Sequence, residues 1–108
     1  MTKESPRVKR RYPRLSPPKV MLVAWQGGGQ HMVSRVRTMG LGGLFISTPN
    51  PPPVGTVVKL IFEVPGGEVR ARAIVRNAKP GRGMGVEFTG MGFQDRARMS
   101  HLLNQLFQ

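Results

Sequence analysis

Short runs in which apolar and polar residues alternate recur along most of the chain, and Gly and Pro separate one run from the next. The clearest run covers 69–76, where every second residue is Val or Ala and three of the residues between them are Arg. A period of two is that of a strand with one buried face, because successive side chains point to opposite sides. We therefore predict strands at 19–26, 31–39, 44–47, 56–63 and 69–76, and a sixth marked by Met84, Val86 and Phe88.

These runs follow one another at intervals of roughly ten residues, a spacing typical of small antiparallel barrels. The sequence thus predicts an all-β fold, a six-stranded antiparallel β-barrel with a C-terminal α-helix. From Phe93 the apolar period lengthens to that of a helix, which we expect to cover one mouth or edge of the barrel. The predicted apolar stripe of this helix contains Phe93, Ala97, Leu103 and Phe107, widened by Met99, Leu102 and Leu106.

Positive charge is concentrated before the first strand. The chain of 108 residues carries 17 Lys and Arg against 5 Asp and Glu, a formal net charge of +12. Residues 1–19 contain seven of these cations and one acid, so half of the net charge lies there, together with four prolines that exclude a helix. We divide the chain into a basic arm, 1–18, and a barrel with its helix, 19–108. The arm is either a solvated basic tail or a segment that orders around one compact anion.

Several kinds of chemistry are not expected. Cys is absent, the two His residues lack metal-ligand spacing, and the five acids form no evident catalytic pair. We therefore expect no enzyme, no metal and no cofactor. The longest apolar run, 20–25, is far shorter than the roughly 20 residues of a membrane span. A cytoplasmic protein with an anionic partner is the simplest interpretation.

Two local patterns carry most of the functional information. The first is Arg10-Arg11-Tyr12-Pro13-Arg14, in which Arg10 and Arg14 lie four apart; guanidinium groups grip phosphate oxygens and stack on purine rings. The second is the segment 38–45, TMGLGGLF, a glycine-rich turn between two strands. Glycine permits positive φ and a close approach of a ligand to the backbone.

In this order, the two patterns resemble the PilZ domain, the bacterial receptor module for cyclic-di-GMP. The family has an RxxxR arm, a strand and a [D/N]xSxxG turn on a six-stranded barrel, followed by a helix. The segments VGTVVKLIFEVP, VRARAIVR and GMGVEF and the C-terminal helix extend the resemblance from about Lys9 to Phe107. The resemblance implies that the arm folds over the cyclic dinucleotide, with Arg10 and Arg14 on phosphates and guanine faces and Gly43 allowing close approach.

The second motif departs from the family pattern at two positions. Thr38 stands where the family has Asp or Asn, and Gly40 stands where it has Ser. We still place Thr38, Gly40 and Gly43 at the ligand site, with Arg11 and Arg37 as further candidates. An alternative arginine pair with the same spacing is Arg7 and Arg11.

Two functions remain open on this basis. One is a cyclic-di-GMP receptor that acts through its arm and an effector protein of unknown identity. The other is a degenerate PilZ adaptor in motility or pilus assembly that does not bind nucleotide. Nucleic acid is not the expected partner, because few aromatic residues interleave with the cations, although Arg70, Arg72 and Arg76 make one basic strand face.

Overall fold

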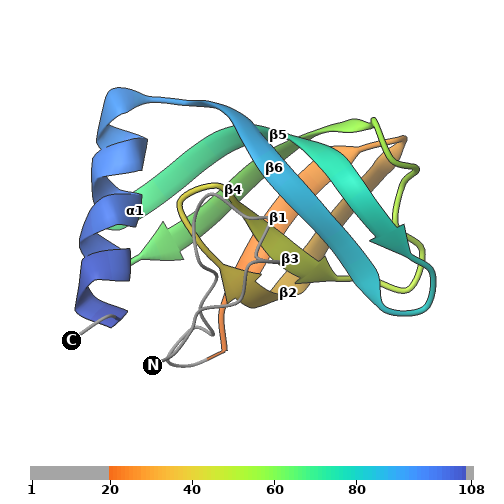
Figure 1. Cartoon of the computed structure of the whole chain (residues 1–108), viewed down its shortest axis with the longest axis horizontal. Helices are drawn as coiled ribbons and strands as arrows, with labels where there is room; N and C mark the ends of the chain where they lie inside the picture. The colour runs from red at the N-terminus through yellow and green to blue at the C-terminus, as the bar shows by residue number, and fades with distance from the viewer. Residues whose placement is uncertain (1–19, 107–108) are drawn as a thin grey trace, which may run out of the picture.

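Six strands and one helix form within residues 20–106, the part of the chain that the computed structural model describes (Figure 1). The six predicted strands are confirmed, although the fifth is longer than its alternation indicated. The bounds are β1 (Leu22–Gly27), β2 (Gln30–Met39), β3 (Gly43–Ser47), β4 (Val57–Val64), β5 (Gly67–Lys79), β6 (Gly83–Met91) and α1 (Phe93–Leu106).

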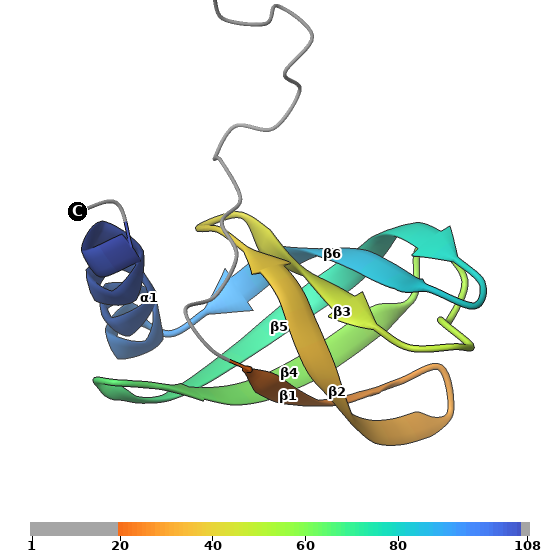
Figure 2. The same cartoon turned by 90° about the horizontal axis from the view of Figure 1, so that it is seen from below.

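The strands close into an antiparallel barrel with the order β1-β2-β3-β6-β5-β4, so the predicted fold class is confirmed. β1 completes the closure by pairing with both β2 and β4. The register along β5 and β6 shifts twice, once between Arg72 and Ala73 and once between Val75 and Asn77. Such bulges bend a strand and increase its twist, which lets the long β5 curve around the barrel (Figure 2).

The core is formed by the inward residues of every strand. In β4 burial alternates strictly, with Val58, Leu60 and Phe62 inside. Trp25 belongs to this core, and its indole Nε1 donates a hydrogen bond of 2.9 Å to the hydroxyl of Ser34. The one polar atom of the indole is thereby satisfied within the apolar interior.

A tight hairpin joins β1 and β2. Gly27 pairs with Gln30, which leaves a loop of the two residues Gly28 and Gly29. Their φ angles are 59° and 79°, in the left-handed region that glycine adopts without strain. Two residues with positive φ match the right-handed twist of the strands that they join.

Helix α1 stands at one end of the barrel, beside β4 and β5 (Figures 1 and 2). Where β6 has ended, the carboxylate of Asp95 accepts a hydrogen bond from the Arg70 amide at 3.0 Å. The guanidinium of Arg98 donates to the Glu68 carbonyl at 2.7 Å. No helix within residues 20–106 is both long enough and apolar enough to cross a membrane.

The predicted apolar stripe of this helix is partly wrong. Met99, Leu102 and Leu103 are buried, whereas Phe93 is 94% exposed and Ala97 is also exposed. Consecutive helical residues are about 100° apart, so a residue six positions before Met99 lies about 120° away from it around the axis. The first turn of α1 therefore presents Phe93 to solvent. Phe107 lies outside the described residues.

Candidate functional site

The β2–β3 turn, which contains the second sequence motif, is held by two backbone hydrogen bonds. The Gly40 amide donates to the Gly43 carbonyl at 3.0 Å, which closes the turn. The Phe88 amide donates to the Gly42 carbonyl at 2.9 Å, which ties the turn to β6. These bonds fix the predicted glycine-rich turn against the side of the barrel.

The structure gives the glycines in this turn a different role from the two that the sequence predicted. None of Gly40, Gly42 and Gly43 has a positive φ, so conformational freedom is not what the turn requires. Gly43 is needed for space, because a Cβ atom there would collide with the carbonyl oxygen of Val86. The close approach at Gly43 is between β3 and β6 of the protein itself.

Thr38 lies on the outer surface of the barrel at the end of β2. It pairs with Phe45, and both side chains are half-buried, whereas the next pair, Met39 and Leu44, points into the core. Because side chains alternate along a strand, Thr38 and Phe45 lie side by side on the outer face. The site residue predicted at position 38 therefore faces outward, next to an aromatic ring.

Arg37 is displayed by a β-bulge. The register of β2 and β3 shifts between Val36 and Thr38, so Arg37 is the extra residue and has no partner of its own on β3. Its side chain is exposed and lines an outer groove of about 440 Å³. We call this the cationic groove; its lining residues are Arg37, Phe45, Ser47, Thr48, Pro49, Gly81 and Arg82.

The sequence reasoning missed Phe45 and Arg82. Phe45 occupies an outward position of β3, and its ring covers Gly83, where a Cβ atom would lie 2.8 Å from Cε1 of Phe45. An aromatic residue at the polar position of an alternating strand was a signal that could have revealed it. Arg82 follows the β5–β6 turn, and sequence spacing alone does not bring it to Arg37.

Within residues 20–106, no carboxylate forms an ion pair with Arg37 or Arg82 of the groove. The two ion pairs found among the described residues lie elsewhere: Arg76 with Glu87 at 2.6 Å and Arg70 with Glu68 at 3.4 Å. Within the same range, no three His, Asp or Glu side chains cluster closely enough to hold a metal ion. Two guanidinium groups and an aromatic ring in one groove favour a ligand that combines negative charge with a flat ring.

The chain enters the barrel beside this site. The Val36 amide donates to the Met21 carbonyl at 2.8 Å, so the segment before β1 continues along β2 toward Arg37. The predicted arm residues Arg10, Arg11 and Arg14, and the alternative Arg7, lie outside the described residues. Of the remaining predicted residues, Thr38, Gly40 and Gly43 come together at the turn, with Arg37 next to them in β2.

Comparison with known proteins agrees with this architecture. The sequence model described as PilZ domain matches residues 8–105. No curated protein matches the sequence. The PilZ domain of CeSA from a cellulose-synthesizing bacterium superposes with a TM-score of 0.65 and 21% identity, covering 89% of this chain and 99% of that one.

Two longer proteins also share the fold. The inhibitor of motility MotI (DgrA) of Bacillus subtilis gives a TM-score of 0.73 at 19% identity and covers 93% of this chain. MrkH of K. pneumonia, solved as a complex with c-di-GMP, gives 0.72 at 16% identity and also covers 93%. This chain spans about half of both, 52% in each case. At these identities the likeness establishes the fold.

Proposed function

Because the chain belongs to the PilZ domain family, we propose that it is a receptor for cyclic-di-GMP that binds the ligand on the outer face of β2 and β3. The observation that carries this proposal is the hydrogen bond between Met21 and Val36, 2.8 Å long. This bond places the start of the described chain beside Arg37, on the side of the barrel where the second motif lies. The segment that contains RxxxR therefore joins the described chain close to the turn that contains the second motif.

Chain length allows the arginines of the arm to reach the site. Six peptide units separate Arg14 from Val20, where the described chain begins, and an extended chain spans at most about 3.5 Å per residue. The Cα atom of Arg14 is thus within about 21 Å of that of Val20. Arg10 is within about 35 Å by the same measure. Val20 is next in register to Arg37, and neighbouring strands lie about 4.8 Å apart, so both limits are several times the distance from Val20 to Arg37.

The described residues of the site suit a cyclic dinucleotide. Its phosphates are anionic, and Arg37 and Arg82 offer guanidinium forks that the described carboxylates do not neutralise. Phe45 offers a half-buried ring beside which a base can stack. Arginine and phenylalanine side chains suit ligand binding rather than catalysis, so we infer a receptor and not an enzyme. We further propose that this receptor acts in the cytoplasm and signals to an effector protein.

A nucleotide-free adaptor, with a place in motility or pilus assembly, remains the second candidate because of Thr38 and Gly40. Gly40 has no hydroxyl to donate or accept a hydrogen bond, and a Thr hydroxyl replaces part of what a carboxylate or amide supplies. A buried polar ligand group that loses its partner costs about 1–3 kcal/mol. Two such losses weaken binding by a factor of roughly one hundred or more. The adaptor function follows if the cations do not compensate for this loss.

Calorimetric titration with cyclic-di-GMP tests the proposal. We expect binding to the wild-type chain, and a loss of at least tenfold in affinity for Arg14→Ala, since one charge-assisted contact contributes about 1.5–3 kcal/mol. Arg96→Ala, an exposed arginine on α1, is the matched control and is expected to bind as the wild type does. No heat from the wild type at high micromolar ligand overturns the receptor proposal. An effector that is captured equally by wild type and by the Arg10→Ala and Arg14→Ala double variant then supports the adaptor.

A further inference from the structure

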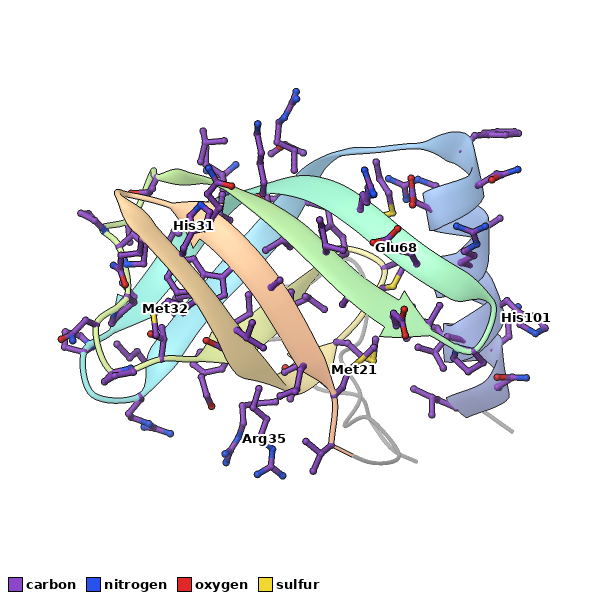
Figure 3. All side chains as sticks on the ribbon, turned by 180° about the vertical axis from the view of Figure 1, so that it is seen from behind. Met21, His31, Met32, Arg35, Glu68 and His101 are labelled. Atoms are coloured by element: carbon purple, nitrogen blue, oxygen red, sulfur yellow. The ribbon has the colours of Figure 1, made fainter. Side chains whose placement is uncertain are left out.

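An uncovered apolar row crosses the outer face of β2, β1 and β4, on the side of the barrel away from the cationic groove. Ala24 of β1 is paired with Val33 of β2 on one side and with Ile61 of β4 on the other. All three are exposed, Val33 to 65% and Ile61 to 39%, and Leu22 beside them is exposed to 54%. Figure 3 shows this face in front, and in Figure 2 α1 stands beside the barrel without covering it.

On one side of the apolar row, two cations face each other. Lys59 of β4 is paired directly with Arg72 of β5, and both are exposed. Like charges directly opposite each other weaken a sheet. Within residues 20–106, neither side chain has a carboxylate within ion-pair distance.

On the other side of the apolar row, two anions face each other in the same way. Glu63 of β4 is paired with Glu68 of β5, and both are exposed. Glu68 has a partial partner in Arg70, at 3.4 Å, whereas Glu63 has no cation within ion-pair distance among the described residues. β4 and β5 therefore have a positive pair and a negative pair on the two sides of the apolar row. Arg35 of β2, opposite Leu22, is a further exposed cation on the side of Glu63.

The two pairs cannot neutralise each other within one chain. Lys59 and Glu63 are four residues apart on a single strand, and a strand rises about 3.3 Å per residue, which separates their Cα atoms by about 13 Å. A second copy of the chain removes this difficulty. A two-fold axis that runs along the apolar row exchanges its two sides, so Glu63 of each copy faces Lys59 of the other.

We propose that this face is a homodimer interface, in which two barrels pack through the outer faces of β2, β1 and β4 about that axis. Val33, Ala24 and Ile61 then meet their own counterparts, as expected for a self-complementary two-fold contact. The apolar centre with charged flanks is the usual arrangement of a protein interface. Glu68 and Arg72 extend the same complementarity at the edge of the contact. Arg70 lies opposite Ile61, on the line of the axis, and forms an exposed ion pair of 3.4 Å with Glu68 of its own chain.

Sedimentation equilibrium of the full chain, without nucleotide and in about 150 mM salt to screen the net charge, tests the interface. We expect the wild type to dimerise. Lys59→Glu alone, and Glu63→Lys alone, each place like charges in trans and are expected to weaken the dimer by about tenfold or more. Each variant also places an unlike charge opposite its β5 neighbour, Arg72 or Glu68, so the monomer remains folded.

Mixing the two variants gives the decisive result. A Lys59→Glu chain has two carboxylates at these positions and a Glu63→Lys chain has two ammonium groups, so an equimolar mixture is expected to form a heterodimer. Lys79→Glu, an exposed cation at the far end of β5, is the matched control and is expected to leave the dimer intact. A wild type that stays monomeric at about 1 mM, or a mixture that forms no heterodimer, overturns the proposal.

Discussion

The two outer faces of the barrel are made in the same way but present opposite surfaces. On β2 and β3 the outward positions include Phe45, Ser47 and the bulged Arg37, which with Arg82 line a positively charged groove of about 440 Å³. On β2, β1 and β4 the outward positions hold Val33, Ala24 and Ile61, which line a mainly apolar hollow of about 690 Å³. The inward residues of both faces belong to one core. In a barrel this small, the outward-facing side chains of each strand therefore determine which class of partner each face suits.

The largest effect is expected from Gly43→Ala, beneath the groove side of the barrel. The added Cβ meets the carbonyl of Val86, a backbone atom that cannot yield without separating β3 from β6. We expect a loss of about 3 kcal/mol in the free energy of unfolding, measured by urea denaturation. The comparison glycine is Gly29, at the end of the apolar side, where Gly29→Ala meets nothing within 4 Å and carries only the strain of its φ of 79°. That strain is about 1–2 kcal/mol. Equal losses for both variants would contradict the assignment of Gly43 to close packing.

A crossed pair of charge reversals tests whether the two faces act separately. Arg82→Glu puts a carboxylate into the cationic groove and is expected to lower the affinity for cyclic-di-GMP by at least about tenfold. It should leave the dimerisation constant unchanged. Lys59→Glu should have the reverse effect, with dimerisation weakened by about tenfold or more and nucleotide affinity retained. Calorimetry gives the nucleotide affinity of each variant, and sedimentation gives its dimerisation constant. A variant in which both quantities change would show that the faces are coupled.

Ser34→Ala is expected to have a smaller effect, confined to the layer beneath the apolar row. The substitution leaves the indole N–H of Trp25 without its 2.9 Å partner inside the core. We expect the free energy of unfolding to fall by about 1 kcal/mol, measured by thermal or urea denaturation. Ser100→Ala on α1 is the control, since Ala favours a helix and should not destabilise it. Dimerisation that weakens with Ser34→Ala in the folded protein would mean that the face depends on the core beneath it.

Glu87→Gln is expected to have the smallest effect. Its ion pair with Arg76 is short, 2.6 Å, but both side chains are more than half exposed, and such pairs contribute between 0 and about 1 kcal/mol. Glu87 also lies opposite Gly43, so removing its charge should raise the affinity for an anionic ligand by about twofold. A calorimetric titration at low and at physiological salt measures this gain. A decrease in affinity would place the ligand away from the β2–β3 turn.

The strands were predictable because burial on one side imposes a period of two, as in β4, where it is unbroken. Alternation also marks which residues point outward, but it does not tell which outward residues meet. The bulge at Arg37 depends on how β2 pairs with β3, and the contact of Lys59 with Arg72 depends on the register between β4 and β5. The predicted burial of Phe93 was wrong, because an apolar residue in a helix is buried only if its turn of the helix contacts the barrel. The cationic groove and the apolar row both follow from pairing across strands, which local spacing does not determine.

The closed strand order has a consequence for how partners can be recognised. Each of the six strands has a neighbour on both sides, although β2 pairs with β3 only from Val36 onward. Elsewhere in the barrel, recognition by strand addition, a common way for sheets to capture extended segments, would require one of the six pairings to open first. Over most of its surface, a protein that binds the described barrel therefore contacts side chains, on one of the outer faces or on α1. The same closure protects the chain from edge-to-edge aggregation while it is folded.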